Sequence, residues 1–536
     1  MSRVVVVGSG ASGVHFALTA LEKGHHVMML DVGRDKPPVV GPEQHFDELK
    51  AELPDPAGYF LGSSYEAVTL PGTTGEVYAF PPSKRYVFAE AGEFGAQGNG
   101  LAPLLSFARG GLAEAWTAGV YPFNEHELED FPLRYSDLSG YYDTVAKRIG
   151  VNGSADDLAR FFPVHEHLEQ PLYLDRHSRL LLDTYERQRG HLNQRLGCHL
   201  GRSRIATLTQ ARPDRPACSY CGRCLWGCPT GAFYTPAITL QECLKHPNFC
   251  YQPGVQVQHF TYDAQRQIRA VVCTSGNGRD RTEFAVDRLV LAAGTLSSTR
   301  IFLESIYRAT GQRVRLSGLM DNRQVLVPFL NLRLLGAAYE PASYQYHQVA
   351  LGLEGKTPKE YVHGQITTLT TGLVHPIIES LPVDLRTGVR FFRNVRAALG
   401  IVNVNLHDTR RAENYVTLEA GSGSAPGRLQ LHYSPTADEP LRLKQVLRRV
   451  RRALRKLGCV VPPGMVHVRP MGSSVHYAGT LPMSSTPAEF TVSPDCQSHD
   501  FRNLFLADGS TFPFLPAKNL TFTLMANATR VAERIV

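Results

Sequence analysis

The stretch RVVVVGSGASGVHFALTALEKGHHVMMLD, residues 3–31, decides the fold. It reads as an apolar β-strand, a glycine-rich turn, an amphipathic helix and a second strand that ends in an acid. The spacing GxGxxG between a strand and a helix is the fingerprint of a dinucleotide-binding βαβ unit. The sequence therefore predicts a Rossmann-like α/β nucleotide-binding domain that begins at the N-terminal end.

The residues of this unit have distinct expected roles. Gly8 permits the tight turn, Gly10 lets the backbone approach a pyrophosphate, and Gly13 allows the helix to pack closely. The N-terminus of the helix, with Ser12 in its first turn, favours negative charge. Asp31 is placed to accept a hydrogen bond from a ribose hydroxyl. A glycine turn without a ligand is the alternative, and the complete unit of strand, helix and acid favours the dinucleotide.

The rest of the chain indicates more than one domain. A length of 536 residues exceeds what one hydrophobic core usually serves. LVLAAGT, residues 289–295, reads as a buried strand that enters a glycine turn on the same nucleotide domain. Alternating segments between residues 305 and 440 predict a mostly antiparallel sheet. We therefore expect a nucleotide-binding domain over 1–304, an α+β substrate domain over 305–463, and a return to the first domain over 464–536.

The net charge of +7 is concentrated in RLKQVLRRVRRALRKLG, residues 442–458. Apolar residues recur there at helical spacing opposite a basic face, which predicts a surface helix packed on the second domain. The alternative is a docking face for an acidic protein partner or for the surface of an anionic membrane. No nucleic-acid-binding motif accompanies the charge, so we expect no nucleic acid partner.

The expected absence of a secretory signal and of a membrane-spanning segment predicts a cytoplasmic protein. The first predicted strand starts at residue 3, which leaves no room before it for a secretory signal. No apolar run reaches the roughly 18 residues that a membrane-spanning helix needs. In a reducing compartment the ten cysteines are not expected to form a disulfide framework.

Two C-terminal blocks carry a family resemblance: SSVHYAGTLPM, residues 473–483, and NLFLADGSTFPFLPAKNLTFTLMANATRVAERI, residues 503–535. With GGLAEAWTAGVYPF, residues 110–123, they make the chain resemble the glucose-methanol-choline (GMC) family of FAD oxidoreductases over nearly its whole length. The resemblance implies a GMC-type FAD-binding domain, a substrate domain with a mostly antiparallel sheet, and oxidation of the CH–OH group of a small alcohol or sugar-like molecule.

The resemblance also implies roles for single residues. His476 matches the catalytic histidine of the family, and Asn519 matches its second catalytic position, which is Asn or His. A histidine can take the proton of the substrate hydroxyl, and a fixed amide can hold the substrate oxygen. Asp508 and Gly509 match contacts to the FAD diphosphate and ribityl chain. The other expected FAD contacts are Gly110, Gly111, Trp116, Val255, Ala293 and Gly294.

One departure from relatives of the pyranose oxidase type concerns how FAD is held. Those sequences carry a histidine before the tryptophan of this turn and attach FAD to it covalently, whereas this chain has Ala115 before Trp116. We therefore expect FAD to be bound noncovalently.

The segment CSYCGRCLWGCP, residues 218–229, has the C-x2-C-x2-C-x3-C-P spacing of bacterial ferredoxins. The spacing predicts an iron-sulfur cluster held by Cys218, Cys221, Cys224 and Cys228, and some sugar dehydrogenases of the wider family carry such a centre near FAD. Cys228 serves another cluster in two-cluster ferredoxins, so three ligands are an alternative. Structural thiols, zinc and a redox disulfide are the others.

Three functions follow from these readings. The main one is an FAD-dependent alcohol or sugar dehydrogenase that passes electrons to the cluster, with an unknown final acceptor. The first alternative is an oxidase that uses oxygen and has structural cysteines. The second is a non-redox flavoprotein lyase, because one fold hosts several chemistries.

Overall fold

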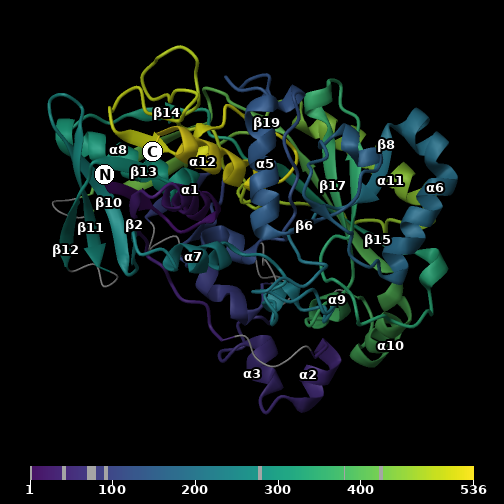
Figure 1. Ribbon diagram of the computed structural model, residues 1–536. Helices are drawn as coiled ribbons and strands as arrows, with labels where there is room; N and C mark the ends of the chain where they lie inside the picture. The colour runs from purple at the N-terminus through teal and green to yellow at the C-terminus, as the bar shows by residue number, and fades with distance from the viewer. Residues whose placement is uncertain are drawn as a thin grey trace.

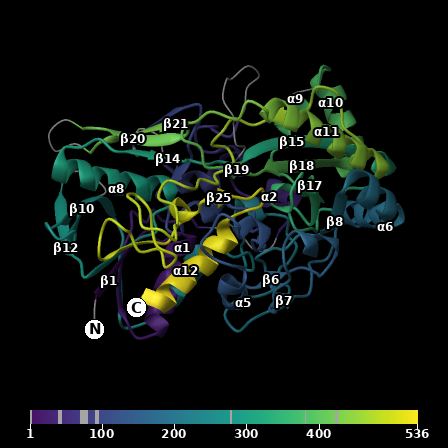
Figure 2. The same ribbon diagram turned by 90° about the horizontal axis from the view of Figure 1, so that it is seen from above.

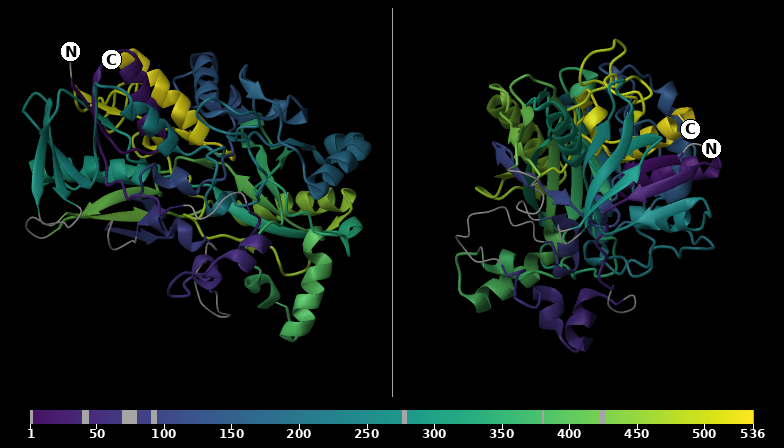
Figure 3. Two further views of the ribbon diagram at one scale, coloured as in Figure 1. Left: turned by 60° about the horizontal axis from the view of Figure 1, so that its bottom comes forward. Right: turned by 90° about the vertical axis from the view of Figure 1, so that its left-hand side faces the viewer.

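The computed structural model describes residues 3–38, 44–68, 80–89, 95–275, 280–379, 381–421 and 426–535. The chain forms two lobes, and both termini lie in the same lobe, close to α1 and α12 (Figure 1; Figure 3). The core of the first lobe is a five-stranded parallel sheet in the order β24-β13-β1-β2-β9. Its strands are β1 (Arg3–Val7), β2 (His26–Leu30), β9 (Phe249–Gln252), β13 (Arg288–Leu291) and β24 (Leu504–Leu506).

Helices cover this parallel sheet because its strands are apolar on both faces. α1 (Ala11–Glu22) packs against α12 (Thr521–Ile535) and α7 (Pro236–Leu244), and α12 also contacts α5 (Ser136–Ile149). α8 (Thr295–Thr310) contacts an antiparallel three-stranded sheet of β10 (Val255–Tyr262), β11 (Ile268–Ser275) and β12 (Arg281–Ala285). The βαβ unit predicted from residues 3–31 is therefore present at the centre of this lobe.

The second lobe is built on a seven-stranded antiparallel sheet with the path β22-β15-β18-β17-β16-β8, in which β23 also pairs with β15. Its strands are β8 (Cys198–Arg202), β15 (Arg323–Asn331), β16 (Val349–Leu353), β17 (Val362–Thr368), β18 (Leu399–Leu406), β22 (Cys459–Val460) and β23 (His467–Val468). The mostly antiparallel sheet predicted from the alternating segments is confirmed.

The two faces of this sheet differ in polarity. Val325, Leu351, Val402 and Val404 lie on the face that packs against α6 (Arg176–Leu196) and α11 (Glu439–Lys456). α11 comes from the basic segment 442–458 and buries Val446, Val450 and Leu454 on this face, while most of its Arg and Lys side chains stay partly or fully exposed. A surface helix packed on the sheet is the arrangement predicted for this segment.

The opposite face of the sheet is polar and faces the first lobe. Gln365 lies directly across from Asn403, and His363 lies across from Asn405, so all four side chains share one face. Gln365 reaches Asn519, which lies beside the N-terminus of α12 in the first lobe. The site discussed below therefore forms where this polar face meets the nucleotide-binding lobe.

The remaining elements surround these two sheets. A four-stranded sheet in the order β14-β20-β21-β4 lies beside α8 (Figure 2). α2, α3, α9 and α10 project together from one side of the molecule (Figure 1). The bounds are β3 (Phe88–Ala89), β4 (Ala96–Asn99), β5 (Leu105–Ser106), β6 (Val151–Asn152), β7 (Leu168–Glu169), β14 (Arg315–Ser317), β19 (Asp408–Thr409), β20 (Tyr415–Glu419), β21 (Arg428–His432), β25 (Phe514–Leu515), α2 (Phe46–Glu52), α3 (Pro56–Leu61), α9 (His375–Glu379) and α10 (Leu385–Val395).

Two of these placements concern the predicted domain boundaries. β8 lies within 1–304 but joins the sheet of the second lobe, whereas β20 lies within 305–463 and contacts α8 of the first lobe. The boundaries at 304 and 463 stay predictions. Among the described residues, no helix is long and apolar enough to cross a lipid bilayer.

Candidate functional site

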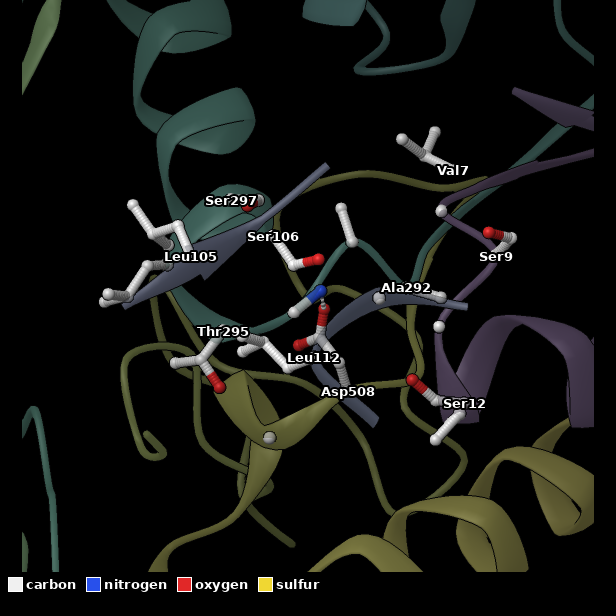
Figure 4. A pocket seen from close by; sticks show the side chains of 18 of the residues that line it. Val7, Ser9, Ser12, Leu105, Ser106, Leu112, Ala292, Thr295, Ser297 and Asp508 are labelled. Carbon is white, nitrogen blue, oxygen red and sulfur yellow. Dashed lines mark hydrogen bonds between the residues drawn. The ribbon is translucent and has the colours of Figure 1, made fainter. Parts of the chain in front are cut away.

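A large cleft in the first lobe brings together most of the predicted cofactor residues. Its empty space is about 1270 Å³, part of which is open to solvent. In Figure 4, Ser9 and Ser12 of the β1–α1 turn lie on one side of Asp508, and Leu105 and Thr295 lie on the other. The predicted residues that line the cleft are Gly8, Gly10, Ser12, Asp31, Gly111, Val255, Ala293, Gly294, Asp508, Gly509 and His476.

The β1–α1 turn fits a bound phosphate. A Cβ on Gly13 would lie 2.0 Å from the carbonyl oxygen of Gly8, and a Cβ on Gly8 would lie 2.8 Å from that of Ala292. Beside Gly10, by contrast, no atom lies within 4 Å of the corresponding Cβ position, and no side chain caps the N-terminus of α1 there. The uncapped N–H groups and the positive end of the helix dipole are therefore available to an anion such as the FAD diphosphate.

Asp31 belongs to a hydrogen-bond network at the end of β2. It accepts hydrogen bonds from the hydroxyls of Ser9 and Tyr251, the latter at 2.9 Å, and burial raises its pKa to about 6. The Ser9 oxygen in turn accepts the backbone N–H of Gly110 at 3.0 Å. Gly110 therefore supports the turn from behind and does not line the cleft. Sequence reasoning missed Ser9 and Tyr251, because no pattern links residue 251 to the N-terminal fingerprint.

Asp508 connects the end of β24 to the β13–α8 turn. Its buried carboxylate accepts the N–H of Gly294 at 3.0 Å and the N–H of Ser510 at 3.1 Å. Burial raises the pKa of Asp508, and these hydrogen bonds oppose that effect. The side chain thus fixes two loops of the cleft wall. Gly13 and Trp116 do not line the cleft, and Trp116 donates its indole N–H to the carbonyl oxygen of Tyr234 at 2.9 Å.

His476 and Asn519, 43 residues apart in sequence, meet where the cleft approaches the second lobe, with 3.4 Å between His476 Nε2 and Asn519 Nδ2. Burial lowers the pKa of His476 to about 4, so its ring is neutral near pH 7. The preceding residue, Val475, has a φ of +62°, a conformation that is strained for a β-branched residue. Strain of this kind clusters at functional sites.

Three further residues hold this pair, and sequence reasoning missed all of them. Asn322 Oδ1 lies 2.9 Å from His476 Nδ1, and Gln365 Nε2 donates to Asn519 Oδ1 at 2.7 Å. Asp321 accepts hydrogen bonds from the N–H of Gly472 and the hydroxyl of Ser474, which fixes the loop before His476, and burial raises its pKa to about 7. These contacts join residues that are 151–154 positions apart in the chain, so no local sequence pattern could predict them.

One small cavity is lined by the four cysteines of the predicted cluster, Cys218, Cys221, Cys224 and Cys228, together with Ser343 and Tyr344. Burial and the neighbouring cysteines raise the pKa of Cys224 well above its usual range, and burial raises that of Cys221. Metal ligation requires thiolates. Within the described ranges, no group of three or more His, Cys, Asp or Glu side chains is arranged to hold a metal ion. The predicted iron-sulfur cluster is therefore not supported by this arrangement.

Comparisons with known proteins agree with this architecture. Residues 410–528 match the family model described as GMC oxidoreductase. The chain is 24% identical to paromamine 6'-oxidase of Streptomyces fradiae, over 99% of this chain and 91% of that protein. It is 22% identical to 2-methyl-1,2-propanediol dehydrogenase of Mycolicibacterium austroafricanum, over 99% and 94%.

Among solved structures, pyridoxine 4-oxidase from Mesorbium loti superposes with a TM-score of 0.62 at 15% identity, over 100% of this chain and 99% of that one. At this identity the superposition shows a shared fold. The match of residues 410–528 to the GMC oxidoreductase model, together with full-length relatives that are named as an oxidase and a dehydrogenase, supports a flavoprotein oxidoreductase of the GMC family.

Proposed function

We propose that the protein oxidises the CH–OH group of an alcohol or sugar-like substrate, with FAD held noncovalently in the cleft. Bound FAD would supply the hydride acceptor. The observation that carries the proposal is the meeting of His476 and Asn519 at the edge of a cleft whose glycine turn fits a dinucleotide.

His476 is the proposed proton acceptor. An alcohol C–H bond is a poor hydride donor until the hydroxyl proton leaves, so a base must lie within hydrogen-bond reach of that hydroxyl. The lowered pKa of His476, about 4, keeps the ring able to accept a proton over the neutral range. The amide of Asn519 beside it would donate a hydrogen bond to the substrate oxygen as negative charge develops there.

The polar face of the second-lobe sheet supports a substrate with several hydroxyls. Asn403 Oδ1, Asn405 Oδ1 and His363 Nε2 are buried there and have no hydrogen-bond partner within the described part of the chain. A buried polar atom without a partner costs about 1–3 kcal/mol, and substrate hydroxyls would remove that cost. A relative named as a propanediol dehydrogenase adds support for an alcohol substrate.

The proposal is tested by flavin bleaching without oxygen. A panel of alcohols and sugars is mixed anaerobically with purified holoprotein, and loss of the yellow flavin absorbance is followed in a stopped-flow instrument. His476→Ala should keep FAD but lose on the order of 10²-fold or more of the reduction rate. His467→Ala, which alters an exposed histidine nine residues earlier, is the matched control and should match the wild type. A His476→Ala variant that reduces its flavin at the wild-type rate would contradict the proposed role.

The electron acceptor needs its own test. The grouping of four cysteines around one cavity is what supports the iron-sulfur prediction. Protein purified without oxygen should contain roughly three or four irons and matching sulfide per chain if the cluster forms. Cys221→Ser should then lose the iron and slow transfer to an artificial acceptor, while flavin reduction by substrate stays normal. Iron-free protein that turns over with oxygen would favour the oxidase alternative.

A further inference from the structure

The contacts of Asn322 fix which way its side-chain amide faces. Asn322 lies directly before β15 and is 1% exposed. Its Nδ2 lies 2.8 Å from the carbonyl oxygen of Leu406 and 3.0 Å from that of Pro516. Carbonyl oxygens only accept hydrogen bonds, so the NH₂ group must face them. The amide oxygen must therefore face His476 Nδ1, 2.9 Å away.

This orientation determines where the proton of the neutral histidine sits. The amide oxygen of Asn322 can only accept, so His476 must donate from Nδ1. A neutral imidazole carries one proton, so Nε2 is unprotonated and its lone pair can accept a proton or a hydrogen bond. Burial keeps the pKa of His476 near 4, so the neutral ring is the relevant form in neutral solution.

The hydrogen bonds on the other side of the ring follow from the same constraint. Asn519 must turn its NH₂ group toward the Nε2 lone pair, at 3.4 Å, because two acceptors cannot share a hydrogen bond. Its amide oxygen then receives the NH₂ group of Gln365 at 2.7 Å. The result is one directed chain, Gln365 to Asn519 to His476 to Asn322, which ends on two backbone carbonyls.

We propose that Asn322 is a positioning residue that holds His476 in the Nδ1–H tautomer, so that Nε2 can accept the hydroxyl proton of the substrate. This inference rests on the proposed function. When Nε2 takes the proton, the ring becomes an imidazolium, and the hydrogen bond from Nδ1 to Asn322 becomes charge-assisted and stronger. Asn322 does not line the cleft and therefore acts on the reaction through His476.

The test compares variants in the anaerobic flavin-reduction assay. Asn322→Leu removes the acceptor for Nδ1. We expect the reduction rate to fall about 10- to 100-fold, the range typical of groups that orient metal-ligating histidines. The dissociation constant of the substrate should stay within about twofold of the wild-type value. Asn331→Leu removes a buried amide from the far end of the same strand and should leave the rate unchanged.

A double mutant separates positioning from a structural role. If Asn322 acts through His476, then Asn322→Leu should cost nothing further in the His476→Ala background, because non-additivity marks residues that work as a unit. Additive losses, or an Asn322→Leu rate within about twofold of the wild type, would overturn the inference. If Asn322→Leu does not retain FAD, Asn322→Ser takes its place, since its hydroxyl is too short to reach Nδ1.

The two proposals fail in different ways. A His476→Ala variant with the wild-type rate removes the proposed function itself. A slow His476→Ala variant beside a fast Asn322→Leu variant removes only the role of Asn322.

Discussion

Lys518, directly before Asn519 in the chain, and Glu127 form an ion pair in the interior, and loss of this pair should be costly. Lys518 Nζ lies 2.7 Å from Glu127 Oε2, and both side chains are fully buried. The other two ammonium protons are directed at the carbonyl oxygens of Pro122 and Phe161, each at 2.8 Å. All three donors of the lysine are therefore used, and Asn519 follows directly in the chain.

Lys518→Met replaces the ammonium group with an apolar side chain of similar length. The Glu127 carboxylate then stays buried with a single backbone hydrogen bond, from the N–H of Asn124 at 2.8 Å. Removing one partner of a buried ion pair typically costs about 3–5 kcal/mol, because the other charge is left uncompensated. We expect a loss of this size in the free energy of unfolding.

The assay is urea unfolding of the purified protein, followed by far-UV circular dichroism and by release of flavin fluorescence. Glu127→Gln in the Lys518→Met background removes the stranded charge and should recover at least about 1 kcal/mol. Lys359→Met is the control, because Lys359 pairs with the exposed Asp130 at 3.0 Å and such surface pairs contribute at most about 1 kcal/mol. Stability of Lys518→Met within about 1 kcal/mol of the wild type, or no recovery in the double mutant, would refute the reasoning.

Three further predictions concern the cofactor and the histidines. FAD should appear in the supernatant after acid precipitation, because Ala115 offers no attachment point, and flavin in the pellet would contradict this. Gly13→Ala should destabilise the apoprotein, since its Cβ would lie 2.0 Å from the carbonyl oxygen of Gly8, whereas Gly10→Ala should fold normally and bind FAD more weakly, as measured by flavin content and thermal unfolding. Burial lowers the pKa of several histidines, to about 3 for His165, His347 and His407 and to about 4 for His177 and His259. Because a histidine in the unfolded chain has a pKa of about 6.5, the unfolded state binds more protons than the folded state below that pH. The contribution of these histidines to stability should therefore be full above that pH and be lost as the pH drops toward 4. Replacing His347 and His407 with Gln should make the fall of the unfolding temperature over this window smaller, and an unchanged fall would argue against buried neutral histidines.

Much of the fold was predictable because its signals are local. The GxGxxG turn needs glycine at positions 8 and 13, because a Cβ at either position would collide with a carbonyl oxygen. For Gly13 this is the carbonyl of Gly8, and for Gly8 it is the carbonyl of Ala292. The alternating segments that became β17 and β18 place Gly364, Ile366, Val402 and Val404 on one face and His363, Gln365, Asn403 and Asn405 on the other, a pattern with a period of two residues. The helical spacing of apolar residues in 442–458 likewise indicated the buried face of α11.

The sequence by itself determined the nucleotide-binding unit and the antiparallel sheet, and the family resemblance pointed to His476 and Asn519 as the proposed catalytic pair. Only the tertiary structure decided how that pair is held. Asn322 lies directly before β15 and Gln365 lies in β17. The direction of each amide is set only when folding brings Asn322 against the backbone carbonyls of Leu406 and Pro516, and Gln365 against Asn519. These hydrogen bonds depend on the distances and angles between atoms of residues that are far apart in the chain. A local sequence pattern contains neither the distance nor the angle.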